Sequence, residues 1–66
     1  MKIDINKLNI AMAEKCLGNK ELCKIANISL VTLINIKTKK RNCLPVTVGK
    51  IAKALKIPVS ELVENE

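Results

Sequence analysis

The strongest constraint on the fold is a run of apolar residues at helical spacing in the last third of the chain. The run consists of Val48, Ile51, Ala52 and Leu55. Their spacing of i, i+3, i+4 and i+7 places them on one face of an α-helix, where we expect them to form part of the core. Pro45 suits the first turn of such a helix and the Ile57-Pro58 step ends it, so the pattern predicts a helix over residues 45–56.

Shorter stripes of the same kind predict four more helices. The expected ranges are 7–16, 20–26, 30–37 and 59–64. Asn6 and Ser29 are suited to cap the helices that follow them, because a short polar side chain can accept a bond from the first turn. Alternation of polar and apolar residues over 2–5 favours a short edge strand. A chain of 66 residues leaves no room for a second domain, so we expect one compact all-α domain of five helices over residues 1–66.

The composition favours a small binding domain over an enzyme. A hydrophobic fraction of 48% is too high for a disordered chain, and the net charge of +6 favours an anionic partner. The chain has no His, so it lacks an imidazole base and any Ser–His or Cys–His pair, and we expect no enzymatic activity. It also has no Phe, Tyr or Trp on which unpaired bases could stack, which argues against a single-strand binder.

Three cysteines are present, Cys16, Cys23 and Cys43, and no two of them form a CxxC pair. We therefore expect no zinc or other metal site and no cofactor. We interpret the cysteines as small structural residues and expect Cys43, beside a basic loop, to be the most reactive thiol. No long apolar run follows the first residues, so we expect no signal peptide, no membrane span and a cytoplasmic location with reduced thiols.

The segment 19–37 is the part of the sequence that indicates a function. It holds two expected helices joined by a turn of about three residues, which is the spacing of a helix-turn-helix. Asn27 suits the left-handed position of the turn, and Cys23 is small where the two helices approach each other. The expected inward residues are Leu22, Ala26, Leu33 and Ile36. The second helix of such a pair can enter the major groove of duplex DNA.

Four stretches of the chain resemble a known family. They are KLNIAM, NKELCKIANIS, LVTLINIKTKKR and VGKIAKALKIPVSEL. From Lys7 to Val63 the chain is similar to the Cro and lambda-repressor type of helix-turn-helix domain, also called the XRE type. This resemblance implies a five-helix, lambda-repressor-like DNA-binding domain. It also implies a transcriptional regulator that binds double-stranded DNA. In the simplest case this regulator is a homodimeric repressor that blocks an operator.

Individual positions match the family unevenly. Asn19 stands where the family often has a Gln that bonds a phosphate, while Ser29 and Thr32 match the family's hydroxyl residues. Lys40 and Arg41 match a basic pair that often follows the third helix. The departures are Leu30, Val31 and Ile34 in place of polar base-reading side chains, Lys37 and Lys39 in place of Glu and Gly, and Asn27 in place of the turn Gly.

Two sets of site residues follow from this comparison. The predicted DNA-binding residues are Asn19, Lys20, Ser29, Leu30, Val31, Thr32, Ile34, Asn35, Lys37, Lys39, Lys40 and Arg41. Within this set we expect the hydroxyl residues to cap the third helix and Asn35 to read adenine, while the lysines, Arg41 and Asn19 grip phosphates. The predicted dimerisation residues are Val59, Leu62 and Val63, of which Leu62 also points inward.

Several alternatives stay open from the sequence alone. The basic run after the third helix could be a solvated loop, and the last helix a frayed terminus. Leu30, Val31 and Ile34, like Ile10 and Ile25, fall off the inward stripes in this register. They could be scattered surface residues, core residues in another register, or a patch that binds protein. In that last case the chain is a protein-interaction module, such as an antitoxin-like or adaptor subunit.

Overall fold

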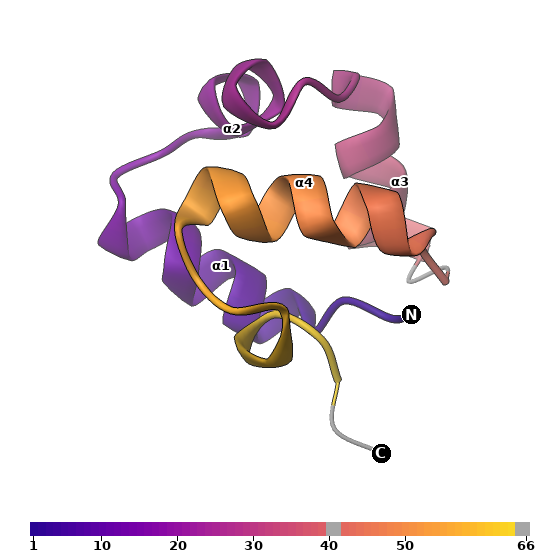
Figure 1. Cartoon of the computed structure of the whole chain (residues 1–66). Helices are drawn as coiled ribbons and strands as arrows, with labels where there is room; N and C mark the ends of the chain where they lie inside the picture. The colour runs from indigo at the N-terminus through magenta and orange to yellow at the C-terminus, as the bar shows by residue number, and fades with distance from the viewer. Residues whose placement is uncertain (40–41, 65–66) are drawn as a thin grey trace.

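The computed structural model describes residues 1–39 and 42–64. Within them, four α-helices are followed by one 3₁₀ turn (Figure 1). The elements are α1 (Ile5–Glu14), α2 (Asn19–Ala26), α3 (Leu30–Lys39), α4 (Pro45–Leu55) and η1 (Val59–Glu61). The predicted all-α class is therefore confirmed, but the expected fifth helix over 59–64 is wrong, because only a 3₁₀ turn forms there.

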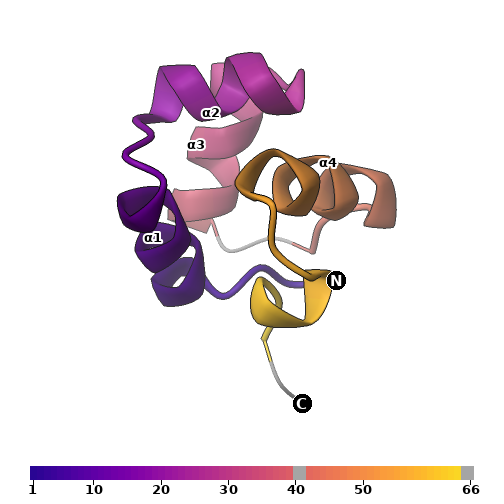
Figure 2. The same ribbon diagram turned by 60° about the vertical axis from the view of Figure 1, so that its left-hand side comes forward.

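Helix α4 lies in the middle of the molecule. It packs against α2 on one side and against η1 on the other, and Figures 1 and 2 show α2 and η1 at opposite ends of the fold. The predicted stripe of α4 is completely buried, with Val48, Ile51 and Leu55 at 0% exposure. The pattern thus identified the central helix of the fold correctly.

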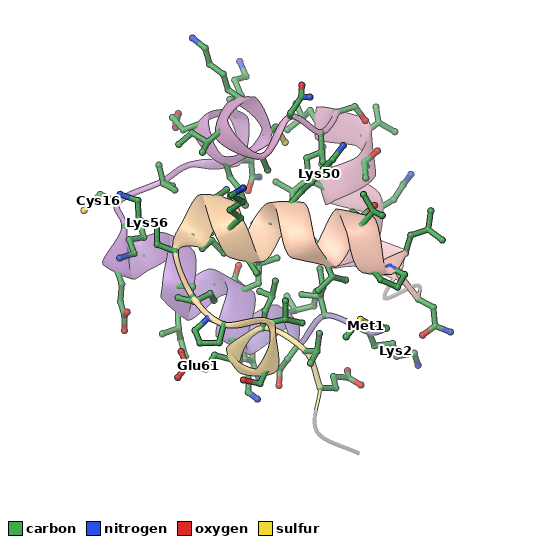
Figure 3. All side chains as sticks on the ribbon, in the orientation of Figure 1. Met1, Lys2, Cys16, Lys50, Lys56 and Glu61 are labelled. Carbon is green, nitrogen blue, oxygen red and sulfur yellow. The ribbon has the colours of Figure 1, made fainter. Side chains whose placement is uncertain are left out.

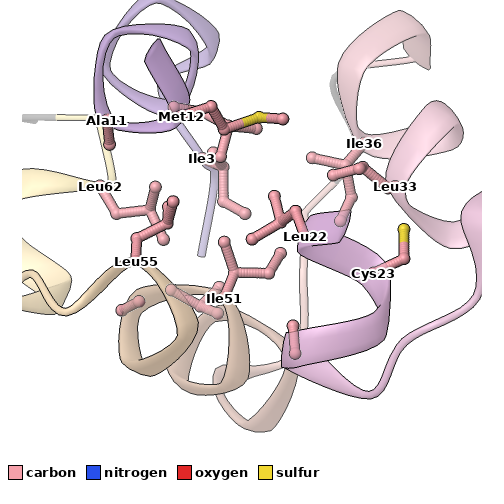
Figure 4. Packing of buried hydrophobic residues seen from close by; sticks show 14 residues of the cluster. Ile3, Ala11, Met12, Leu22, Cys23, Leu33, Ile36, Ile51, Leu55 and Leu62 are labelled. Atoms are coloured by element: carbon pink, nitrogen blue, oxygen red, sulfur yellow. The ribbon is translucent and has the colours of Figure 1, made fainter. Parts of the chain in front are cut away.

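One hydrophobic cluster joins the four helices, Leu62 directly after η1 and the first residues of the chain (Figure 4). Leu22 of α2 and Ile51 of α4 point toward each other at its centre. Its members are Ile3, Leu8, Ala11, Met12, Leu22, Cys23, Ala26, Leu33, Ile36, Val48, Ile51, Ala52, Leu55 and Leu62. Because this cluster is the whole core of a small domain, its largest side chains account for most of the stability.

Helix α1 begins earlier than the sequence indicated. Asp4, rather than Asn6, is its N-cap, because the Oδ1 of Asp4 accepts bonds from the backbone N–H groups of Asn6 and Lys7 at 3.0 and 3.2 Å. A carboxylate at this end also interacts favourably with the helix dipole. At the other end the helix stops at Glu14 and not at residue 16.

Three helices end in the same way. The residues after α1, α2 and α4 include one with a left-handed backbone, at Cys16, Asn27 and Lys56, with φ of 55°, 58° and 56°. In each case the next backbone N–H bonds a carbonyl five residues back, from Leu17 to Met12, Ile28 to Cys23 and Ile57 to Ala52. This bond satisfies carbonyls that would otherwise lack a partner at the helix end. Asn27 was expected in this role, whereas Cys16 and Lys56 were not.

The start and the end of the described chain are paired through their backbones. The N–H of Asp4 bonds the carbonyl of Leu62 at 2.9 Å, and the N–H of Glu64 bonds the carbonyl of Lys2 at 2.9 Å. Only one antiparallel bridge, Ile3 to Val63, forms among the described residues, so the expected edge strand is reduced to this bridge. This pairing occupies the carbonyl of Leu62 and the N–H of Glu64, so a helix cannot continue through them, and the expected fifth helix stops short.

Replacing the two glycines, Gly18 at the N-cap of α2 and Gly49 inside α4, tests these helix positions with opposite expected effects on stability. We expect Gly49→Ala to raise the free energy of unfolding by about 0.5–1 kcal/mol, because Gly49 lies inside α4 and an added Cβ would meet nothing within 4 Å. Gly18→Ala should instead lower it by a similar amount, about 0.5–1 kcal/mol. A Cβ at Gly18 would lie 2.8 Å from the Oε2 of Glu21, the atom that caps its N–H. Thermal unfolding followed by circular dichroism measures both, and shifts of the same sign would contradict the account.

Candidate nucleic-acid interface

Helices α2 and α3 meet through a short turn over residues 27–29. The turn closes because Asn27 takes the left-handed conformation and the Sγ of Cys23 lies 3.6 Å from the carbonyl oxygen of Ser29. Leu22 and Leu33, one on each helix, are fully buried. The expected helix-turn-helix is therefore present, with the inward residues predicted for it.

Ser29 caps α3 as its position predicted. Its Oγ accepts a bond from the backbone N–H of Thr32 at 3.0 Å and lies 2.7 Å from the Oγ1 of Thr32. The two hydroxyls therefore bond each other and the helix end. This arrangement fixes the start of α3 relative to the turn.

Asn19 and Lys37 are brought together from opposite ends of the helix pair. The Nζ of Lys37, near the end of α3, donates to the Oδ1 of Asn19, the first residue of α2, at 2.7 Å. The lysine keeps N–H groups that this bond does not use, and the amide keeps its NH₂ group. Lys20, the next residue of α2, is exposed. Cationic and amide donors thus gather where α2 begins.

The N-terminus of α2 is not itself open to an anion. The Oε2 of Glu21 accepts the backbone N–H of Gly18 at 3.1 Å, which places a carboxylate at the helix end. A phosphate at this point would have to displace a like charge. The side chains of Asn19 and Lys37 are therefore better placed to bind an anion than the backbone beside them.

The outward face of α3 is apolar. Leu30, Val31 and Ile34 are 36%, 68% and 42% exposed. We call these three residues the α3 apolar face. They are not core residues in a shifted register, because Leu33 and Ile36 fill that role. Ile10 and Ile25 are exposed as well, as their positions off the inward stripes indicated.

Asn35 lies at the edge of this face and is half-buried. Its side chain makes no hydrogen bond within the part of the chain that the structure describes. It borders a shallow hollow of about 230 Å³ that Thr32 and residues 42–44 and 47 also line. An amide in this position retains both its donor and its acceptor groups for a ligand.

The other predicted site residues fall into three groups. Lys39 is the last residue of α3, and Lys40 and Arg41 lie outside the described residues. Leu62 is fully buried in the core, which leaves none of its side chain exposed for the predicted contact with a second subunit. Val59 and Val63 are half-buried and pack against the core.

Two exposed apolar residues at the start of α4 were not predicted. Leu44 and Val46 are 72% and 68% exposed. Leu44 precedes Pro45, and Val46 is two residues ahead of the buried Val48, so both fall off the inward stripe of the predicted helix. A helical projection of residues 45–56 would have placed Val46 on the outer side.

Within the described ranges 1–39 and 42–64, no group of three His, Cys, Asp or Glu side chains is arranged to hold a metal ion. No helix in that part of the chain combines the length and the apolar character that crossing a membrane requires.

The surroundings of the three thiols do not favour the order of reactivity that was expected from the sequence. Burial raises the pKa of the Cys23 thiol, an effect that Lys37 opposes in part, and burial also raises the pKa of Cys43. Cys16 is exposed at the edge of the molecule (Figure 3). Because the thiolate is the reactive form, a raised pKa and burial both slow the reaction of a cysteine. The burial of the thiols therefore favours Cys16 over Cys43 as the more reactive cysteine.

Alkylation at neutral pH tests this order. We expect iodoacetamide to modify Cys16 first and Cys23 and Cys43 more slowly, with the slower pair gaining on Cys16 as the pH rises toward their raised pKa values. Peptide mapping by mass spectrometry measures each site, and the unfolded chain, in which all three thiols are exposed, is the control. Faster modification of Cys43 than of Cys16 in the folded protein would contradict the burial described here.

Comparisons with known proteins support the fold. No protein family matches the sequence, and no curated protein matches it either. Among solved structures, the chain is similar to the restriction-modification controller protein C.AhdI from Aeromonas hydrophila, with a TM-score of 0.77 and 23% identity. The similarity covers 86% of this chain and 86% of that one. Together with the α2–turn–α3 geometry, it confirms the predicted all-α helix-turn-helix fold.

Proposed function

We propose that this chain is a regulator of transcription that binds double-stranded DNA with α3 in the major groove. The observation that carries this proposal is the position of the α3 apolar face and Asn35 on a groove-sized helix, with Lys20 and the Asn19–Lys37 pair beside it. A B-DNA major groove admits one helix, and cationic side chains next to that helix meet the phosphates on either side. The net charge of +6 draws the chain toward a polyanion.

The Asn19–Lys37 pair is proposed as a phosphate contact. Lys37 holds the Oδ1 of Asn19, which leaves the amide NH₂ and the ammonium to donate to one phosphate group. The carboxylate of Glu21 beside this point keeps the phosphate on the side chains rather than on the helix end. Lys39, Lys40 and Arg41, which follow along the chain, are proposed to contact the backbone as well.

A homodimer is part of the proposal. A single helix pair of this size covers few base pairs, whereas two copies double the phosphate contacts and place two α3 helices one DNA turn apart. Val59 and Val63 are the residues of the predicted dimer contact that retain exposed surface. Operator occupation by such a dimer would repress transcription without any cofactor. The similarity to a controller protein supports a regulatory role.

Selection from a random duplex library at two salt concentrations tests the function. We expect an enriched two-fold-symmetric site whose half-sites lie about 10 bp apart. Binding should weaken by orders of magnitude between about 50 and 200 mM salt, because each neutralised phosphate releases counterions. Enrichment of an asymmetric single half-site would contradict the proposed homodimer. The absence of salt-dependent binding would contradict the proposed DNA-binding function.

The exposed α3 apolar face supports a second candidate function. Leu30, Val31 and Ile34 could instead be buried against a protein partner, as in an adaptor or antitoxin-like subunit. An apolar interface depends little on salt, whereas phosphate contacts depend strongly on it. Comparing DNA binding at the two salt concentrations therefore separates the two candidates.

A further inference from the structure

Most polar side chains of α3 are already engaged within the protein. The hydroxyls of Ser29 and Thr32 bond each other at 2.7 Å, and the Nζ of Lys37 bonds Asn19. The Oγ1 of Thr38 donates to the backbone carbonyl of Ile34 at 2.8 Å. Among the described side chains of this helix, Asn35 is left with an amide that no internal bond occupies. The internal bonds of Thr32, Lys37 and Thr38 thus reduce the number of hydrogen bonds that the described side chains of α3 can offer to bases.

The side chains that remain outward are apolar and share one side of the helix. Leu30, Val31 and Ile34 lie within an arc of about 100° around the helix axis, given 3.6 residues per turn. Thr38, one turn beyond Ile34, falls within the same arc. This stripe runs along the part of α3 that would be inserted in a groove, and Asn35 lies beside it with an amide that makes no hydrogen bond within the described part of the chain.

In the floor of a major groove, apolar side chains have one favourable partner. The C5-methyl group of thymine projects into the groove, whereas the edges of the other bases present donors and acceptors. An aliphatic side chain packed on those donors and acceptors would leave them without hydrogen bonds, at a cost that a methyl contact does not carry. A 5-methylcytosine base places a methyl group at the same ring position.

We propose, on the basis of the DNA-binding function above, that the α3 apolar face recognises pyrimidine C5-methyl groups in the major groove. Leu30, Val31 and Ile34 select base steps that carry such methyls, and Asn35 adds an amide contact to an adjacent adenine. The occupant is a DNA duplex rather than an apolar protein because Lys20 and Lys37 flank the face in a chain of net charge +6. The preferred sites are rich in A·T pairs or in 5-methylcytosine.

Three random duplex libraries, made with thymine, with uracil in its place, or with 5-methylcytosine in place of cytosine, test this inference. Uracil lacks only the methyl group of thymine. We expect A·T-rich sites to be enriched from the thymine library and to lose about fourfold in affinity for each contacted methyl when uracil replaces thymine, the equivalent of one buried methylene. The third library should add sites that contain 5-methylcytosine.

The outcomes separate this inference from the function on which it rests. Equal affinities for thymine and uracil versions of the enriched sites would overturn methyl recognition and leave DNA binding intact. Salt-dependent binding to all libraries with no enriched sequence would overturn methyl recognition as well, because the α3 apolar face would then not distinguish one base sequence from another. If no library is bound, the DNA-binding function fails, and the inference fails with it.

A pair of isosteric variants locates the contact. Val31→Thr replaces a methyl of the α3 apolar face by a hydroxyl, and we expect it to bring the thymine-to-uracil affinity ratio closer to one. Val46→Thr makes the same change at an equally exposed valine of α4, where both side chains are 68% exposed. The control should leave the ratio unchanged even if it weakens binding. Equal effects of the two variants on the ratio would contradict a contact by α3.

Discussion

Leu22→Ala is expected to lower the free energy of unfolding by about 2–5 kcal/mol, which is a large part of the total for a domain of this size. Leu22 is fully buried where α2 packs against α3 and α4, and its side chain points toward Ile51 (Figure 4). Removing it leaves a cavity in the hydrophobic cluster that the described residues form. Helix α2 would lose the packing of its fully buried leucine against α3 and α4, and this packing holds the two helices of the helix-turn-helix together.

The matched control for this variant is Ile25→Ala. Ile25 lies on the same helix and is 57% exposed, so the same kind of truncation should cost less than about 0.5–1 kcal/mol. Thermal or denaturant unfolding followed by circular dichroism measures both variants. Similar losses for Leu22 and Ile25 would mean that the inward face of α2 is assigned incorrectly.

The double variant Lys20→Ala, Lys37→Ala is expected to reduce the slope of log affinity against log salt by about 2, because each lost phosphate contact contributes about 0.9. Loss of Lys37 also removes the bond that holds Asn19, so affinity at low salt should fall together with the slope. Lys20 lies in the first turn of α2 and Lys37 in the last turn of α3, on the side proposed to face DNA. Titration of a fluorescent duplex over a range of salt concentrations measures the slope.

Lys15→Ala, Lys53→Ala removes the same total charge elsewhere and serves as the control. Lys15 follows α1, Lys53 lies in the last turn of α4, and both side chains are exposed. A general effect of net charge would lower the slope equally in the two double variants. That result would contradict a specific phosphate contact by the Asn19–Lys37 pair.

The features that depend on nearby residues could be predicted from the sequence. The stripe from Val48 to Leu55, the left-handed Asn27 and the N-cap Ser29 each follow from spacing or from one side chain acting on its own backbone. The exposure of Leu30, Val31 and Ile34 also followed from their position off the inward stripe. Local rules thus yielded the all-α class, the turn and the orientation of α3.

The features that depend on distant residues could not be predicted in this way. The backbone pairing of residues 2–4 with residues 62–64, which prevents the fifth helix, joins the two ends of the described chain. The bond from Lys37 to Asn19 joins residues 18 positions apart, so no local pattern indicates it. The complete burial of Leu62 and the partial burial of Cys43 could not be predicted either, because burial depends on how the chain ends and loops pack.

A titration of ¹⁵N-labelled protein with a short DNA duplex at low salt, followed by nuclear magnetic resonance, tests most directly whether α3 is the DNA-contacting element. We predict that the amide signals of Leu30, Val31 and Ile34 and of the start of α2 shift as DNA is added. Signals around Ile10, on the outer side of α1, should stay in place. Shifts confined to α1, or no shifts at all, would contradict the assignment of α3 to the groove.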